Sequence, residues 1–307
     1  MHSPVLPGLF AVPVTALSMS VAGLALLFIG LFAARNDIAR ARGLGRVVAL
    51  TNLCFAIPLA VFGAEHFSLG SSMLGLVPLY MPWRLFWIYF VGAALIIAAL
   101  SIATKIQVRW SGLLFGIMMF LFVALIHLPG AIKTGERNIW TIVFREMSFG
   151  GGGWVLASVA VGQWRWKGKT LFIVGRVLIA MAAIFFGVQH FLHPYGVPVV
   201  PLQKQMPAWI PASAVIDYVT GAFLIAGGVC FLTTWKTRLA ATYLGTWILL
   251  LVILYYGPML IGALANPSAG VKLEGLNYFA DTLLFGATVL SLACANNSNN
   301  VSPQRGL

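Results

Sequence analysis

Nine apolar segments, each long enough to cross a lipid bilayer, dominate the sequence. A spanning helix needs about 20 mostly apolar residues. Segments of that kind lie near residues 8–34, 46–67, 84–104, 110–132, 139–162, 170–192, 213–233, 239–264 and 276–295. Only 8% of the 307 residues are charged and 60% are apolar, which excludes an ordinary soluble domain. The sequence therefore predicts an all-α, polytopic membrane protein with nine transmembrane helices.

The basic residues predict how these helices are oriented. Of the 19 Lys and Arg, 13 lie at 35–46, 105–109, 165–176 and 236–238 and at Arg305, which are alternate connections and the tail. Because Lys and Arg are enriched in cytoplasmic loops, we expect the N-terminus outside and the C-terminus in the cytoplasm of a bacterial cytoplasmic (inner) membrane. The net charge of +12 is thus interpreted as a topology signal, and no nucleic-acid partner is expected.

Part of the chain is repeated. Phe62-Gly-Ala-Glu-His-Phe67 recurs 124 residues later as Phe186-Gly-Val-Gln-His-Phe191, with four of six positions identical. A Pro-containing loop follows each motif and is a few residues longer the second time. Beyond that loop the spacing becomes 129, as Pro129 and Pro258 illustrate. Such self-similarity indicates a duplicated unit.

The duplication predicts two tandem four-helix units. We call residues 45–165 copy one and residues 166–296 copy two. An N-terminal transmembrane helix with a basic cytoplasmic loop precedes them over 1–44, and a polar cytoplasmic tail follows over 297–307. Because four helices return the chain to its starting side, the two copies are expected to be parallel bundles that enter the membrane with the same orientation.

Each copy resembles a DoxX-type four-helix membrane domain. The resemblance rests on Phe-Gly-x-x-His-Phe closing the first helix, Tyr-x-x-Gly-Ala-x-Leu-Ile in the second, and His127-Leu128-Pro129 ending the third. In the fourth helix, Arg145-Glu146 precedes Phe149 and the glycine run 150–153. The resemblance covers about residues 46–162 and 170–295. It implies quinone-linked oxidation of thiosulfate, or a place in a membrane assembly that handles thiols and oxidants.

Copy two departs from this pattern. Gln189 replaces Glu65, Tyr256 stands at the place of His127, and Asp281 lies near the place of Arg145. Copy one is therefore the better candidate for a working site.

Ionisable side chains gather in the half of the membrane that is predicted to face outside. Each costs about 2.5–3.5 kcal/mol to insert on insertion scales, so a shared polar pocket open to the outside is the economical interpretation. The candidate catalytic residues are Glu65, His66, His127, Arg145 and Glu146. The candidate cofactor-binding residues are Arg84, Tyr89, His190, Asp217, Tyr218 and Asp281.

The adjacent residues Arg145 and Glu146 point about 100° apart on a helix. We therefore expect each to find a partner elsewhere, with Glu65 or Glu146 pairing with Arg145 or Arg84. The glycine run 150–153 and Gly112-x-x-x-Gly116 predict close helix packing.

Several chemistries fit these residues. A histidine beside a carboxylate in an apolar pocket can exchange a proton with a quinone carbonyl. The same groups could instead neutralise one another and lock helices together, or line a path for an ion, a proton or a solute. Two histidines and two carboxylates could hold zinc or iron, but no H-x-x-x-H or E-x-x-H spacing presets such ligands, so no metal site is assigned.

Three functions remain, and whether the chain is an enzyme stays open. The first is a subunit of a redox assembly that takes a quinone or a small thiol-type substrate. The second is a noncatalytic scaffold with protein partners in a larger membrane complex. The third is a solute or proton carrier.

Overall fold

The structure is a computed structural model that describes residues 8–161 and 166–295. It is all-helical, with 84% helix and no strand among these residues, which confirms the predicted all-α class. The predicted tail, 297–307, lies outside the described residues.

Twelve helices follow one another along the described chain. Before and within copy one they are α1 (Gly8–Arg40), α2 (Gly45–Ala49), α3 (Thr51–Leu69), α4 (Arg84–Thr104), α5 (Val108–Phe122), α6 (Leu128–Thr134) and α7 (Arg137–Val161). In copy two they are α8 (Trp166–Leu192), α9 (Ser213–Leu232), α10 (Thr237–Leu251), α11 (Gly257–Ala265) and α12 (Ala269–Ala295). A short 3-10 helix, η1 (Gly70–Leu76), follows α3, and π-helices η2 (Val123–His127) and η3 (Val252–Tyr256) join α5 to α6 and α10 to α11.

Eight segments are long and apolar enough to cross a membrane, as expected of a multi-pass membrane protein. They are Val14–Arg40, Thr51–Leu76, Arg84–Thr104, Val108–Thr134, Gly168–Leu192, Ser213–Leu232, Thr237–Ala265 and Ala269–Ala295. The remaining predicted span, 139–162, corresponds to α7, which is not among the eight. This helix is less apolar because it carries Arg145, Glu146 and four consecutive glycines.

The helix boundaries differ from the predicted spans in two ways. The predicted span 46–67 is divided, because α2 ends at Ala49 and α3 begins at Thr51. The predicted spans 110–132 and 239–264 each contain a π-helix, which apolar length alone does not reveal.

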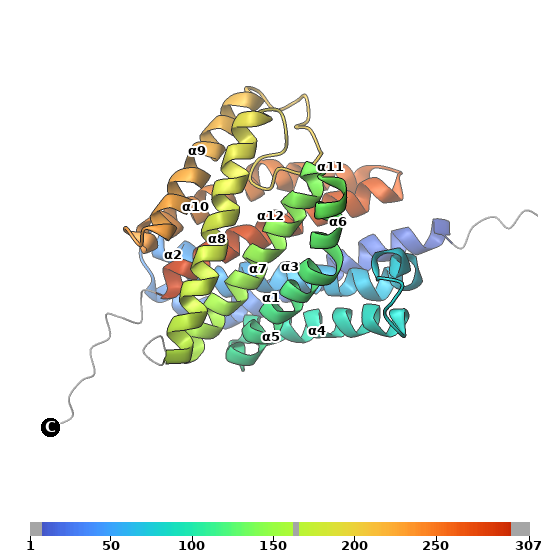
Figure 1. Cartoon of the computed structure of the whole chain (residues 1–307), viewed down its shortest axis with the longest axis horizontal. Helices are drawn as coiled ribbons and strands as arrows, with labels where there is room; N and C mark the ends of the chain where they lie inside the picture. The colour runs from blue at the N-terminus through green and yellow to red at the C-terminus, as the bar shows by residue number, and fades with distance from the viewer. Residues whose placement is uncertain (1–7, 162–165, 296–307) are drawn as a thin grey trace, which may run out of the picture.

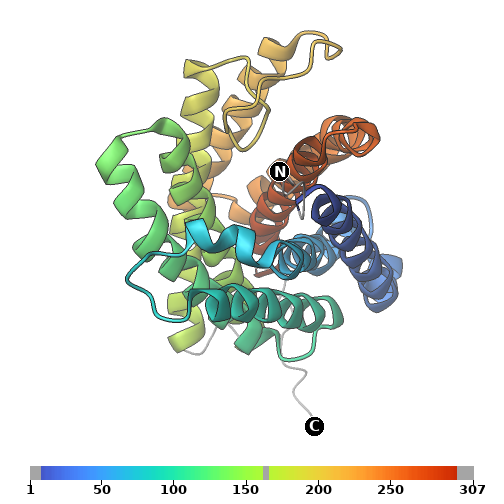
Figure 2. The ribbon, with the colours of Figure 1, turned by 90° about the vertical axis from the view of Figure 1, so that its right-hand side faces the viewer.

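Helices pack in the same order in both copies. In copy one α3 contacts α4, α4 contacts α5 and α5 contacts α7, and in copy two α8 contacts α9, α9 contacts α10 and α10 contacts α12. Between the copies, α7 packs on α8, α12 packs on α3, and α7 contacts α12 (Figure 1). Figure 2 looks nearly along α1, α3 and α4 and shows α1 beside α3 and α12. The last helix of each copy therefore forms the main contact with the other copy.

Local backbone features recur with the sequence repeat. The π-helices η2 and η3 begin 129 residues apart, at Val123 and Val252. Each lies just before a proline, Pro129 or Pro258. Proline has no N–H to donate and crowds the carbonyl four residues earlier, which favours a widened turn at this point. The repeat is thus visible in the backbone as well as in the residues.

Glycines bring helices into close contact, as predicted for α5 and α7. A Cβ placed on Gly112 would lie 2.4 Å from the Gly153 carbonyl oxygen, and one on Gly116 would lie 2.8 Å from the Gly150 carbonyl oxygen. The two backbones therefore touch, which is a main source of packing energy between helices in lipid.

The same contacts fix the correspondence between α7 and α12. Gly150 packs on Met119, and Gly286 packs on Ile248, which stands 129 residues after Met119. Residues of α12 are therefore equivalent to residues of α7 that stand 136 positions earlier. By this correspondence Asp281 is the equivalent of Arg145.

Candidate functional site

Four charged or imidazole side chains form a continuous cluster where α7 meets α12. Arg145 Nη1 lies 2.5 Å from Asp281 Oδ2, and His127 Nε2 lies 3.0 Å from Glu146 Oε1. Arg145 Nη2 lies 3.6 Å from the same Glu146 oxygen and links the two pairs. We call Asp281, Arg145, Glu146 and His127 the charged cluster.

Three segments from both copies build this cluster. Helix α7 supplies Arg145 and Glu146, helix α12 supplies Asp281, and the π-helix η2 ends at His127. The widened turn of a π-helix changes the direction of the side chains that follow, and such turns occur frequently at functional sites. Copy two therefore contributes a carboxylate to a site whose other members belong to copy one.

The charged cluster is largely enclosed but is not completely covered by the protein. The side chains of His127 and Arg145 are 24% and 17% exposed, whereas those of Glu146 and Asp281 are 10% and 9% exposed. Glu146 Oε2 and Arg145 Nε are buried without a hydrogen-bond partner among the described residues. Buried polar atoms are normally paired, so two unpaired atoms in one cluster are unusual.

The contact between Arg145 and Glu146 corrects a prediction. We expected each of these adjacent residues to find its partner elsewhere and not in the other, yet their side chains also approach each other to 3.6 Å. Both side chains are long and bend toward the same point, although their Cβ atoms diverge. The contact is looser than the two outer ones, and the tight partners are indeed from elsewhere in the chain.

Glu65 lies at the edge of the cluster. Asn277 Nδ2 donates a hydrogen bond of 2.9 Å to Glu65 Oε1, which ties α12 to α3. Asn277 precedes Asp281 by four residues on α12. Glu65 lies close enough to Asp281 and Arg145 for their charges to act on its carboxyl group. The sequence interpretation missed Asn277, although the i, i+4 spacing from Asp281 placed it on the same helix face.

Three predicted residues of copy one have other partners. His66 Nδ1 donates to the Phe62 carbonyl at 2.8 Å, since a carbonyl oxygen can only accept. Arg84 donates to the carbonyls of Val77 and Leu74 in its own loop. Tyr89 stacks on Phe67 with ring centroids 5.9 Å apart. The contacts of these three are thus with nearby segments of α3, η1 and their loop, and not with the charged cluster.

The predicted residues of copy two form a separate group. His190 Nδ1 lies 3.3 Å from Asp217 Oδ1, and both side chains are completely buried between α8 and α9. Tyr218 stacks on Phe191 with centroids 5.7 Å apart, which repeats the contact of Tyr89. Of the predicted cofactor-binding residues, only Asp281 joins the charged cluster.

The long loop of copy two fills the place that corresponds to the His127–Glu146 pair. Tyr256 and Thr282 stand at the equivalent positions, and their side chains lie beside each other. The Tyr256 hydroxyl donates to the Pro198 carbonyl of the loop that connects α8 to α9. That loop is inserted into the fold, since Val197 and Val199 are fully buried. Copy two is therefore closed where copy one is accessible.

Further contacts hold this loop in place. The side chain of Arg137 on α7 donates to the Pro201 carbonyl, and Lys204 Nζ pairs with Glu274 Oε2 of α12 at 2.7 Å. The shorter loop of copy one behaves differently: Leu79 is 86% exposed and Trp83 is 79% exposed. The extra residues of copy two thus allow its loop to reach the bundle.

The arrangement suits proton exchange better than metal binding. A histidine and a carboxylate at hydrogen-bonding distance can pass a proton to a ligand. No group of three or more His, Cys, Asp or Glu residues that could hold a metal ion occurs in the described parts of the chain.

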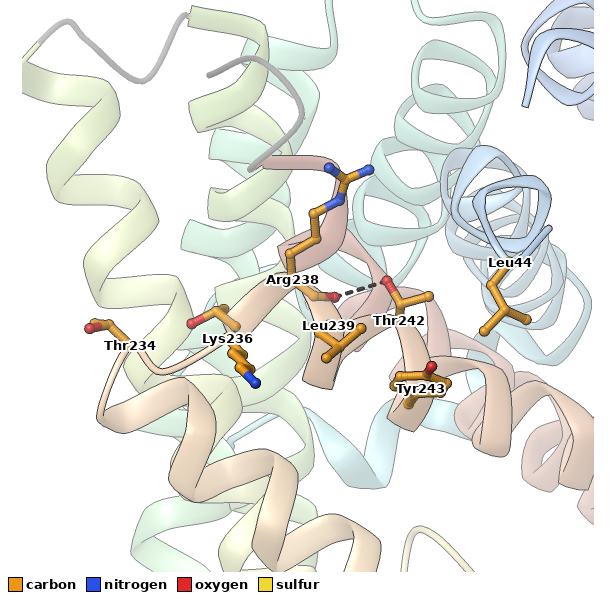
Figure 3. Close-up of a pocket in the computed structure, with 8 residues that line it drawn as sticks. Leu44, Thr234, Lys236, Arg238, Leu239, Thr242 and Tyr243 are labelled. Carbon is orange, nitrogen blue, oxygen red and sulfur yellow. Dashed lines mark hydrogen bonds between the residues drawn. The ribbon is translucent and has the colours of Figure 1, made fainter. Parts of the chain in front are cut away.

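Two cavities lie at the other end of the helices. One of about 610 Å³ lies where α9 turns into α10, and one of about 380 Å³ is lined by Arg40, Lys105 and residues near them (Figure 3 shows the larger). Neither is lined by a residue of the charged cluster.

Comparisons of the chain with protein-family models, with curated proteins and with solved structures found no match.

Proposed function

We propose that the chain is a nine-span, DoxX-like subunit of a redox assembly in a bacterial cytoplasmic membrane, and that its charged cluster binds a quinone or a small thiol-type substrate. In this proposal α7 is the ninth span, and two parallel copies face each other across a pseudo-twofold axis along the membrane normal. The matched helix contacts and the recurring π-helices support the parallel arrangement.

The observation that carries the proposal is the contact of His127 with Glu146, backed by Arg145 and Asp281. Ligands that gain or lose electrons in a membrane usually gain or lose protons as well, and the pair can supply or accept one. Arg145, held by Asp281, positions the Glu146 carboxylate, and the buried Glu146 Oε2 atom is left without a partner among the described residues. The cluster would therefore bind the polar end of the ligand while the apolar helices bind the rest.

The closed state of copy two implies one ligand per chain. The Tyr256 hydroxyl already donates its hydrogen bond to the Pro198 carbonyl, so it is not free to bind a second ligand in copy two. Binding is expected at copy one alone, although the chain contains two copies.

The test uses the purified full chain in lipid nanodiscs. A water-soluble quinone analogue, and separately thiosulfate, is titrated against the wild type and against E146Q and H127Q. We expect one bound molecule per chain for one of these probes, and at least tenfold weaker binding in either variant, since each removes a charge-assisted contact of about 1.5–3 kcal/mol. Y256F, which changes the equivalent position of copy two, should bind as the wild type does. Wild-type affinity in both E146Q and H127Q would contradict the proposal.

The proposed orientation is tested separately by cysteine labelling. Leu79 in the loop of copy one and Ile106 between α4 and α5 are both exposed, and they lie at opposite ends of α4. In intact cells a membrane-impermeant maleimide should label L79C, but should label I106C only after the membrane is opened. The reverse pattern would invert the topology.

A second candidate function, a scaffold for another membrane protein, is favoured by an aromatic ridge on α4. Phe86, Trp87 and Phe90 contact one another, and Phe86 and Phe90 are about half exposed. Aromatic side chains are enriched at protein interfaces, and this ridge continues from the exposed Trp83.

Co-purification in mild detergent separates this function from the first one. If the chain is a scaffold, F86A/F90A should lose a stoichiometric partner and E146Q should keep it. If the ridge faces only lipid, both variants should purify with the same proteins as the wild type.

A further inference from the structure

The larger cavity lies at the corner between α9 and α10, at the end of the helices that carries most of the basic residues. Its lining includes Lys236, Thr237, Arg238 and Leu239 from the start of α10, Tyr243 one turn further along, and Leu44 from the segment between α1 and α2. Figure 3 shows Leu44 lying across from Thr242 and Tyr243. The cavity is therefore shared between copy two and the N-terminal part of the chain.

Positive charge at this cavity is not neutralised by the protein. Lys236 and Arg238 are exposed, and neither has an ion-pair partner in the described ranges 8–161 and 166–295. None of the eight residues that line the cavity is acidic. The cavity is thus electrostatically suited to an anion.

A threonine in the lining points to the same conclusion. Thr237 lines the cavity, is only 6% exposed, and its side chain has no hydrogen-bond partner among the described residues. Thr237 is also the first residue of α10, a helix of 15 residues. The first backbone N–H groups of a helix lack partners within the helix and attract anions. An unpaired hydroxyl, the first N–H groups of α10 and two cations therefore line one cavity.

The rest of the lining is apolar and continues along the outside of the bundle. Leu239 and Tyr243 are about half exposed, and Leu250 and Ile253 follow them along α10 and η3. Trp235 is 62% exposed beside the cavity, and exposed tryptophans mark the boundary between lipid and water. A soluble anion would make no contact with this exposed apolar surface, whereas the acyl chains of a lipid could pack on it.

We propose that this cavity binds the phosphate headgroup of an anionic phospholipid, with its acyl chains along the exposed face of α10. The phosphate lies at the start of α10, beside Thr237 and within reach of the long side chains of Lys236 and Arg238. The site is separate from the charged cluster, and it does not depend on what ligand the cluster takes.

The equivalent corner of copy one provides a natural control. At the 129-residue spacing, Gln107 stands in place of Lys236 and Val108 in place of Thr237, while Arg109 matches Arg238. Copy one therefore lacks one cation and the hydroxyl. Replacing both residues of copy two with those of copy one, as K236Q/T237V, removes the site with changes that this fold already accommodates at an equivalent corner.

The test measures lipid retention by the full chain. The protein is purified, stripped of lipid with detergent, and mixed with phosphatidylglycerol, phosphatidylcholine or inorganic phosphate, and bound lipid is counted by native mass spectrometry. We expect phosphatidylglycerol to bind at least fivefold more tightly than phosphatidylcholine to the wild type. K236Q/T237V should lose that preference, whereas R109Q should keep it. One basic contact at a membrane surface is worth roughly fivefold in binding, so the change is measurable.

Three results would overturn the proposal. They are equal binding of both lipids, wild-type preference in K236Q/T237V, and stabilisation of the protein by inorganic phosphate to the same extent as by phosphatidylglycerol. The last result would mean that the cavity takes a soluble anion. Thermal unfolding in phosphatidylcholine checks that the double variant is folded, and the exposed single variant K236Q serves if it is not.

Discussion

Arg145 and Asp281 occupy equivalent positions in the two copies and are paired with each other, with Arg145 Nη1 2.5 Å from Asp281 Oδ2. The pair connects α7 to α12 at the centre of the molecule. Removal of either charge would leave the other enclosed without its partner, and a single enclosed charge is costly. The pair therefore makes each copy depend on a charge of the other, and at the same time it positions Glu146 through Arg145.

The first prediction concerns this ion pair. R145Q should lower the free energy of unfolding by about 3–5 kcal/mol, because it leaves the enclosed Asp281 carboxylate without its partner. D281N should cost less, because Arg145 keeps its looser contact with Glu146. The exchange R145D/D281R should recover part of the loss. Reversible unfolding by sodium dodecyl sulfate in mixed micelles measures these values. E274Q, which removes a more exposed pair with Lys204, is the control and should cost at most about 1 kcal/mol. An effect of R145Q no larger than that of E274Q would contradict the prediction.

The second prediction concerns the contact of α5 with α7. G112A should destabilise the protein by about 1–3 kcal/mol, because the new methyl group would collide with the Gly153 carbonyl. G262A is the matched control, since nothing lies within 4 Å of a Cβ at that helical position. Thermal unfolding should separate the two variants, with G262A at or above the wild type. Equal melting temperatures for both would show that the helices are not in close contact.

The third prediction concerns the loop of copy two. Y256F removes the hydroxyl that donates to Pro198, at a cost of about 1 kcal/mol. The loop should then open more often, so the amide hydrogens of residues 196–205 should exchange faster with deuterium. Y243F, at an exposed tyrosine, should leave this exchange unchanged. Protection of the loop at the wild-type level in Y256F would mean that other contacts alone hold it.

The fourth prediction concerns the buried pair of His190 and Asp217. D217I places at residue 217 the isoleucine that copy one has at the equivalent position, Ile88. It leaves the buried His190 imidazole without its carboxylate partner. H190L leaves the buried Asp217 carboxylate without its imidazole partner. The losses in free energy of unfolding of the two single variants should add up to more than the loss of H190L/D217I. The difference, which is the coupling energy of the double-mutant cycle, should be about 0.5–3 kcal/mol. Strictly additive losses would show that the two side chains do not interact.

Much of the fold follows from the sequence because its causes are local. Apolar runs of spanning length correspond to long helices, and the glycines at 112, 116, 150 and 153 mark a close helix contact. The motif around His66 and its second occurrence around His190, identical at four of six positions, predicted that both would end a helix, and both lie near the end of α3 and α8.

The site was harder to predict because its contacts connect distant parts of the chain. Arg145 and Asp281 are 136 residues apart, but the motifs had suggested spacings of 124 and 129. Loops of different length change the spacing between helices, so equivalence in α7 and α12 appears only once the helices are packed. The sequence also gave no sign that the Pro198 carbonyl would reach Tyr256, since a backbone group has no signature in the sequence.

Covalent linkage of the two copies has a consequence for their charges. A homodimer of either copy would place two arginines or two aspartates opposite each other across its symmetry axis, and like charges there would drive the subunits apart. In a single polypeptide the two equivalent positions can hold different residues, so that the cation on α7 meets an anion on α12. The single chain can thus hold an attractive ion pair at a position where two identical subunits would place two charges of the same sign.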